Sequence, residues 1–299
     1  ARLLRPPSGS ASGNAFARED APTMKKSKPG VKASKPGARP SKAPNVPAPE
    51  RAPKIAAGST KNNEPPNEFP FELPSVTTAE KRRAAALAEQ LAKAYPDAHC
   101  ELDFTNPHEL LIATILSAQA TDAGVNKATP ALFAKFPTPA AYAASSPEEI
   151  EPFIKTIGLF RNKAKAVHAA MKEVVEQFGG EVPRTMTELL TLRGVARKTA
   201  NVVLGNAYAT NVGFVVDTHI ERLSKRFGLV PRDAKVPAVE RRLMALFPRE
   251  KWCDLSHQII WHGRRACKAR LVGGGCCQDA HPICKEFGIA CEYREPKSC

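Results

Sequence analysis

Two side chains in the second half of the chain have types that suit nucleophilic chemistry at an electrophilic carbon. Lys198 lies in a helix-forming stretch shortly after a glycine, and Asp217 follows nineteen residues later, directly after two valines. A lysine amine can form a Schiff base, which a hydroxyl nucleophile cannot, and a nearby carboxylate can stabilise positive charge that develops at the carbon. We therefore take Lys198 as a candidate nucleophile and Asp217 as its partner. Asp217 also suits a simpler role, the N-cap of the helix that follows it.

The segment Leu189–Leu204 must position the lysine. One apolar helix ends in this segment, a tight turn follows at Gly194, and a second helix begins at once. Backbone N–H groups at such a turn point outward together with those at the helix start, and the helix dipole adds to the anion site that they form. Arg197 and Lys198 add positive charge, and we expect Lys198 to be partly buried at the start of its helix. The alternative is a capping glycine followed by an ordinary surface helix.

The rest of the central region has a helical pattern of apolar residues. Asn106-Pro107 and Ser146-Pro147 each combine an N-cap residue with a proline at the first helical position. Val212–Val216 is the one β-branched run, and it is short. The pattern predicts an all-α core of roughly ten short helices over residues 76–266.

The net charge of +14 is concentrated near the beginning of the sequence. Residues 1–65 contain 13 Lys/Arg and 4 Asp/Glu, and 14 of the 27 prolines precede residue 77. Such a segment buries too little apolar surface to offset its ordering entropy, so we expect residues 1–75 to form a disordered, basic Pro/Ala/Lys-rich tail. The charge favours a polyanionic partner. No apolar run approaches the about 20 residues that span a bilayer, so we expect no membrane partner.

Six of the eight cysteines lie within residues 267–299, and we treat this range as a separate cysteine-rich segment. A terminal cluster without a secretory signal favours a metal site over a disulfide framework. Thiolates hold zinc and iron–sulfur clusters equally well, so the residue types leave the metal open.

The chain resembles the endonuclease III family over residues 78–293. The segment around Lys198 is similar to the family's helix-hairpin-helix motif, although Arg193 replaces the usual proline and Ala196 the second glycine. Further blocks carry the resemblance in the same order as in the family: Leu110–Ala113, Ser117–Asp122, Ile154–Leu159, Val216–His219 and His262–Arg264.

The resemblance implies a two-lobed helix-hairpin-helix glycosylase fold with an iron–sulfur cluster loop. It also implies a bifunctional DNA glycosylase and AP lyase of base-excision repair, which removes oxidised pyrimidines from duplex DNA through a Schiff base and β-elimination. Lys198 would be the nucleophile and Asp217 the essential carboxylate. We expect a monomer whose partner is double-stranded DNA with an oxidised base or an abasic site. Its location would be the cytoplasm and nucleoid in a bacterium, or the nucleus or an organelle in a eukaryote.

The same resemblance assigns the remaining site residues. Gln119 and Leu159 would fill the gap that a flipped nucleotide leaves in the base stack, while His219 and Asp122 are candidates for lining the pocket. The other DNA-binding candidates are Gly194, Ala196, Arg197, Lys268 and Arg270. A [4Fe–4S] cluster would be held by Cys267, Cys277, Cys284 and Cys291, with zinc as the second choice.

The second cluster ligand stays open, because the spacing of the cysteines departs from that of the family. We rank Cys277 first, Cys276 second and His281 third. This departure and the changes at Arg193 and Ala196 support one alternative function, a non-catalytic iron–sulfur helix-hairpin-helix protein that only binds DNA.

Overall fold

The computed structural model describes residues 70–269 and 281–288, and every regular element within these two ranges is helical. The predicted all-α class is confirmed, and the short run Val212–Val216 is not a strand. The helices of the described ranges are α1 (Thr78–Ala94), α2 (Pro107–Leu116), α3 (Asp122–Lys135), α4 (Pro139–Ala143), α5 (Pro147–Ile154), α6 (Phe160–Phe178), α7 (Met186–Leu189), α8 (Arg197–Ala207), α9 (Thr218–Arg226), α10 (Val236–Leu246), the 3₁₀ turn η1 (Arg249–Lys251), α11 (Trp252–Arg265) and α12 (Pro282–Phe287).

One hydrophobic core is formed by α2 to α8. All seven residues from Leu110 to Leu116 are buried, so α2 runs through the middle of this core, as its uniformly apolar sequence indicates. The helix α6 packs against α4 and α5 and contributes an apolar stripe that includes Val167 and Val174.

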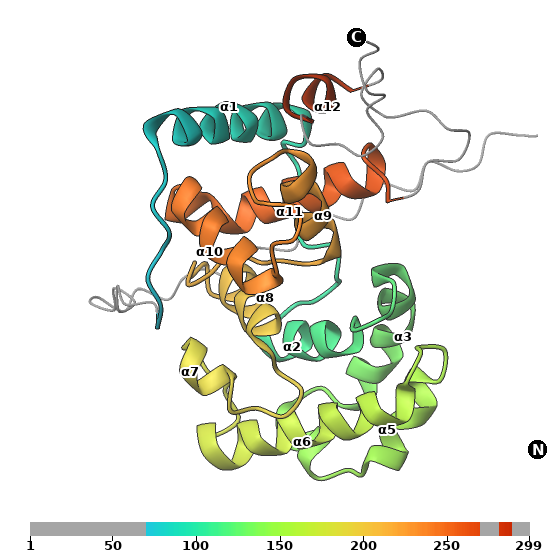
Figure 1. Ribbon diagram of the computed structural model, residues 1–299. Helices are drawn as coiled ribbons and strands as arrows, with labels where there is room; N and C mark the ends of the chain where they lie inside the picture. The colour runs from blue at the N-terminus through green and yellow to red at the C-terminus, as the bar shows by residue number, and fades with distance from the viewer. Residues whose placement is uncertain (1–69, 270–280, 289–299) are drawn as a thin grey trace, which may run out of the picture. The chain divides into compact units, whose positions relative to one another are not determined.

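A second core combines α1 with α9 to α12, although the whole first core separates α1 from these helices in the sequence. Leu87 and Leu91 of α1 belong to the same buried cluster as Leu223 of α9 and Ile259 of α11, and α1 packs directly against α11. Figure 1 shows α8 between the two groups of helices. Because α8 begins with the residue pair Arg197-Lys198, this arrangement places the candidate nucleophile beside both cores.

The predicted helix starts are confirmed by their caps. The side chain of Asn106 accepts a hydrogen bond from the backbone N–H of Glu109 at 3.0 Å, and Ser146 opens α5 with a capping box. Satisfying the first free N–H groups in this way fixes where a helix begins.

The segment before α1 differs from expectation at its end. Phe71 lies inside the range 1–75 that we assigned to the tail, but its side chain packs against the second core. The boundary of the packed chain therefore lies before residue 76. Among the described helices, none is both long and apolar enough to cross a membrane.

Candidate active site

The turn before α8 requires its glycine. Gly194 has a φ of +81°, and a Cβ atom there would lie 3.2 Å from the Cβ atom of Ala166. Arg193 is well accommodated, because its backbone N–H donates a hydrogen bond to Oε2 of Glu173 at 2.6 Å. Ala196 has a φ of −97°, which any residue adopts. The two departures from the family motif are therefore compatible with the hairpin.

Lys198 and Asp217 line the same cavity. The prediction that Lys198 is partly buried is wrong, because its side chain is exposed at the mouth of this cavity. The walls come from the loop before α2, the end of α2, the loop that leads into α9, and the helices α3, α8 and α11. We call this space the catalytic cavity, and it is lined by His99, Cys100, Glu101, Leu102, Thr114, Ser117, Asp122, Lys198, Val202, Val215, Asp217, His257, Ile260, Trp261 and Arg264.

Asp217 is the N-cap of α9, which the sequence left open as its simpler role, and its carboxylate can still act as the partner of Lys198. Its Oδ1 atom accepts a hydrogen bond from the backbone N–H of Ile220 at 2.8 Å and so caps α9. The other oxygen, Oδ2, has no hydrogen-bond partner among the residues that the structure describes. One carboxylate oxygen therefore fixes the position of the group, and the other remains available to a substrate in the cavity.

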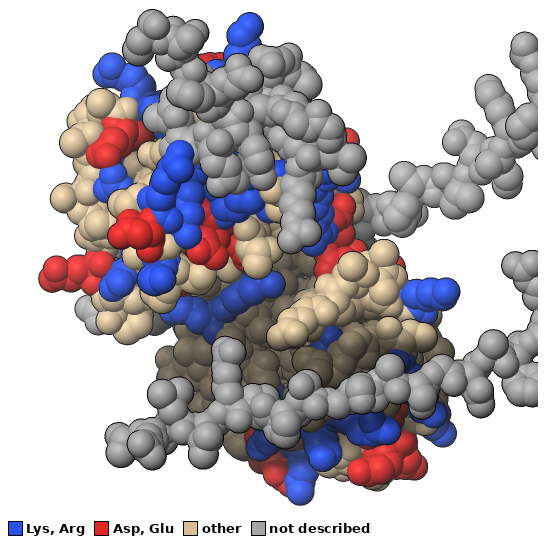
Figure 2. All heavy atoms as spheres, turned by 45° about the vertical axis from the view of Figure 1, so that its right-hand side comes forward, with Lys and Arg blue, Asp and Glu red and all other residues tan. Residues whose placement is uncertain are grey.

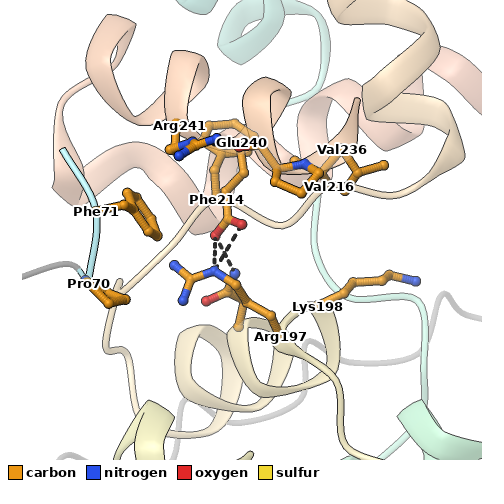
Figure 3. A pocket seen from close by; sticks show the side chains of 11 residues that line it. Pro70, Phe71, Arg197, Lys198, Phe214, Val216, Val236, Glu240 and Arg241 are labelled. Carbon is orange, nitrogen blue, oxygen red and sulfur yellow. Dashed lines mark hydrogen bonds and ion pairs between the residues drawn. The ribbon is translucent and has the colours of Figure 1, made fainter. Parts of the chain in front are cut away.

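Arg197 lines a second cavity, which Lys198 also borders. Its Nε donates to both carboxylate oxygens of the buried Glu240 on α10 at 2.9 Å, and its guanidinium lies 5.0 Å from the ring of Phe71. Asn201 also donates to Glu240, at 3.1 Å. In Figure 3 the side chain of Lys198 extends away from this cluster. The ion pair thus anchors the first turn of α8, so Arg197 has a structural partner that the sequence did not reveal.

The two residues predicted to fill the DNA stack share an unusual backbone. Gln119 has a φ of +54° and Leu159 a φ of +59°, and Ala209 is the one other described non-glycine residue with a positive φ. Leu159 is 58% exposed, the largest exposed fraction of any large hydrophobic residue in the described part of the chain. A bulky residue in the left-handed region costs roughly 1–2 kcal/mol. Such strain is typical of functional sites.

Of the two weaker pocket candidates, Asp122 lines the catalytic cavity and His219 does not. Asp122 forms an ion pair with Arg264 at 2.7 Å, and Arg264 also pairs with Glu101. His219 is half-buried next to Arg222, and burial lowers the pKa of its imidazole. A Cβ atom on Gly263 would lie 3.0 Å from Nδ1 of His219, so the glycine permits the close packing of α9 on α11.

Two of the predicted metal ligands meet in the second core. The sulfur atoms of Cys267 and Cys284 and a ring nitrogen of His262 all lie within 4.8 Å of one another, and all three residues are buried. Arg226 donates a hydrogen bond to Sγ of Cys267 at 3.2 Å, and Nε2 of His262 lies 3.1 Å from Sγ of Cys284. The guanidinium N–H of Arg226 suits a sulfur atom that carries negative charge.

Several predicted residues lie outside the described part of the chain: Cys276, Cys277, Cys291 and Arg270. Lys268 is described and exposed, directly after Cys267. His281 is described at the start of α12, where its Nε2 lies 3.3 Å from the hydroxyl of Tyr95.

Sequence reasoning missed four site residues on α11: His257, Trp261, His262 and Arg264. His262 and Arg264 belong to a block that we used only to recognise the family. In a helix, residues three or four positions apart lie on the same face. Residues 257, 261 and 264 therefore share one face of α11, and this face lines the catalytic cavity. That spacing was the signal that could have found them.

Basic side chains lie on the described surface, whereas the catalytic cavity itself is lined by three carboxylates, those of Glu101, Asp122 and Asp217, and by two basic side chains. In Figure 2 a band of Lys and Arg side chains borders a recessed, mostly uncharged part of the face. Lys198 and Arg264 lie at the catalytic cavity, and Arg197 and Arg241 line the neighbouring cavity of Figure 3. A polyanion would meet a favourable potential on this side.

Comparisons with known proteins agree with this geometry. Residues 112–249 match the model of the HhH-GPD superfamily base excision DNA repair protein. The endonuclease III of Synechocystis sp. is 51% identical over 203 residues, which cover 68% of this chain and 92% of that relative.

Two solved structures are also similar. A non-covalent endonuclease III–DNA complex shares 42% identity with a TM-score of 0.66, covering 72% of this chain and 97% of that one. A trapped endonuclease III–DNA covalent intermediate shares 44% identity with a TM-score of 0.65, covering 71% of this chain and 95% of that one.

Proposed function

Because this chain belongs to the endonuclease III family, we infer that it is a bifunctional DNA glycosylase and AP lyase of base-excision repair. The observation that carries this conclusion is the meeting of Lys198 and Asp217 at one cavity, beside a hairpin suited to phosphate. The substrate that we propose is duplex DNA with an oxidised pyrimidine or an abasic site. We propose that the protein acts as a monomer.

The hairpin would hold the DNA backbone. Ala196 at the N-cap of α8 has no side chain that could cap the helix, so the first N–H groups of α8 remain available to an anion. Gly194 holds the turn that aims them outward. We propose that these groups bind a phosphate next to the target nucleotide.

Lys198 would attack C1′ of a nucleotide that has been flipped out of the duplex. As the bond between C1′ and the damaged base breaks, the base leaves with the electron pair and the sugar carbon gains positive character. The Oδ2 atom of Asp217 is placed to stabilise that charge and to accept a proton from the amine. The C1′–O4′ bond then opens, O4′ takes up a proton, and C1′ and the lysine nitrogen form a Schiff base. Loss of a proton from C2′ then expels the 3′ phosphate by cleavage of the C3′–O bond, which breaks the strand by β-elimination.

Since Lys198 is exposed in the protein itself, the DNA has to enclose it. A nucleotide that enters the catalytic cavity would cover the amine and exclude water from the reacting atoms, which strengthens its interaction with Asp217. Gln119 and Leu159 would occupy the space that the flipped nucleotide vacates. The strained, exposed backbone at Leu159 supports this role.

A [4Fe–4S] cluster would be held by Cys267, Cys284, Cys291 and one further residue, with Cys277 our first choice, then Cys276 and His281. The donor set fits such a group: Cys267 and Cys284 are buried together, Sγ of Cys267 accepts a hydrogen bond from Arg226, and a ring nitrogen of His262 lies 3.1 Å from Sγ of Cys284. When bound, the cluster supplies a structural brace between α11 and the segment after it. Lys268 and Arg270 would then reach the DNA backbone from that segment. Zinc is the alternative metal.

A cleavage assay tests the proposed function directly. Duplexes that contain thymine glycol, an abasic site or no damage are incubated with the full chain under single-turnover conditions. We expect strand cleavage of the first two and a 3′ end with the unsaturated sugar that β-elimination leaves. Binding of all three duplexes without cleavage would instead identify a non-catalytic DNA-binding protein.

A further inference from the structure

The catalytic cavity contains a histidine to which the proposed chemistry gives no role. His257 of α11 lines this cavity together with Lys198 and Asp217, and its side chain is only 9% exposed. In a neutral imidazole, one ring nitrogen is a hydrogen-bond donor and the other is an acceptor, and the neighbours of a buried ring determine which is which.

The hydrogen bonds of Asn206 fix the tautomer of His257. The amide nitrogen of Asn206 donates to the backbone oxygen of Val202 at 2.8 Å, so its Oδ1 faces the histidine as an acceptor. Nε2 of His257 lies 2.8 Å from this Oδ1 and must therefore carry a proton.

The ring is neutral near pH 7. Burial lowers the pKa of His257 to about 4, and the charges of His99 and Arg264 act in the same direction. A neutral ring with its proton on Nε2 has a lone pair on Nδ1. No described residue forms a hydrogen bond with Nδ1.

The other polar groups that line the cavity differ from His257 in charge or exposure. His99 also lines the cavity, but it is exposed, and its Nδ1 lies 2.6 Å from the backbone oxygen of Asp97. Asp122 and Glu101 are both paired with Arg264. The hydroxyl groups of Thr114 and Ser117 donate to backbone oxygens of α2, at 2.7 Å and 2.9 Å. His257 is the buried histidine of this cavity, and its Nδ1 is an uncharged acceptor without a partner among the described residues.

We propose that Nδ1 of His257 accepts a hydrogen bond from a ring N–H of the damaged pyrimidine, which makes His257 a specificity-determining residue. This inference rests on the proposed function. Oxidised uracil and thymine rings keep the N3–H group, which is a donor of the required kind. A cavity that offers an acceptor disfavours a base that lacks the donor, because the buried acceptor is then left unpaired.

The test combines a change in the protein with a change in the substrate. Single-turnover excision is measured for thymine glycol and for N3-methyl thymine glycol, with the wild-type chain and with His257→Ala. We expect methylation to slow excision by the wild type about 10- to 100-fold, as loss of one buried hydrogen bond does. In His257→Ala the penalty from methylation should shrink to about twofold or less, because no acceptor remains to lose.

Cleavage of an abasic site separates the possible outcomes, since that substrate has no base. We expect His257→Ala to lower the ratio of thymine glycol excision to abasic-site cleavage about 10-fold or more. An equal methylation penalty in both proteins, or no penalty in the wild type, would overturn the assignment while leaving the repair activity in place. If the wild type cleaved neither substrate, the proposed function itself would be wrong. Should His257→Ala fail to fold, the same comparison is made with His257→Gln, and an absent penalty in the wild type overturns the assignment without any variant.

Discussion

Oδ1 of Asp217 accepts a hydrogen bond from the backbone N–H of Ile220 at 2.8 Å, so the carboxylate proposed for catalysis also caps the helix α9. This relationship explains how a loosely constrained side chain is held at a cavity wall. The helix start fixes one oxygen, and the geometry of the carboxylate then fixes the direction of the other.

The two roles of Asp217 can be separated by substitution. Asparagine is as good an N-cap as aspartate, so Asp217→Asn should leave the free energy of unfolding nearly unchanged but lower single-turnover excision by about 100-fold or more, because the charge near C1′ is lost. Asp217→Ala should lose activity and also about 1 kcal/mol of stability. Urea denaturation and excision kinetics measure the two effects. Full activity in Asp217→Asn would show that the group is only a cap.

Substitutions at two positions of the hairpin turn, 194 and 196, should differ in their effect on stability and on DNA binding. Gly194→Ala places a side chain at a φ of +81° and close to Ala166, so it should destabilise the protein by about 1–2 kcal/mol and weaken DNA binding. Ala196→Gly should change both quantities little, because the backbone there is already extended. Thermal unfolding and titration of labelled duplex provide the measurements. Equal effects at the two positions would contradict the assignment of the turn.

A substitution at Leu159 should keep or raise the stability of the protein while it lowers the rate of excision. Leu159→Gly removes the left-handed strain and exposed apolar surface, so the protein should keep or gain stability, by up to about 1 kcal/mol. Excision from duplex DNA should nevertheless fall about 10-fold, because nothing then fills the gap in the base stack. A variant with unchanged excision would remove Leu159 from the DNA interface.

The metal ligands can be tested by their effect on iron content. Cys267→Ser and Cys284→Ser should lose iron and the broad visible absorption of a cluster, since each removes a buried thiolate. Cys100→Ser is the matched control and should keep its iron: burial raises the pKa of that thiol to about 12, and it lies in the catalytic cavity.

The same measurement on Cys277→Ser, Cys276→Ser and His281→Ala would identify the remaining ligand. A purified wild-type chain with stoichiometric zinc and no iron would favour the alternative metal.

Local chemistry made much of the fold predictable from the sequence. Helix starts at Asn106 and Ser146 follow from side chains that bond to N–H groups three residues away. The glycine turn before Lys198 follows from the short distance between two apolar runs. Such signals depend only on neighbours in the chain.

Contacts between distant residues were not predictable in this way. The pair Arg197 and Glu240 joins residues 43 positions apart, and its formation turns Arg197 away from Lys198. The exposure of Lys198, the packing of Phe71 and the position of His257 depend in the same way on how the helices pack. A single sequence contains no direct record of that packing.

Borohydride trapping on an abasic duplex tests the central claim most directly. Reduction converts a Schiff base between Lys198 and C1′ into a stable bond, so the wild-type chain should form a covalent protein–DNA adduct. Lys198→Gln should bind the same duplex and form none, whereas Arg193→Gln, on the same hairpin, should form the adduct. An adduct of undiminished yield with Lys198→Gln, or none with the wild type, would contradict the account.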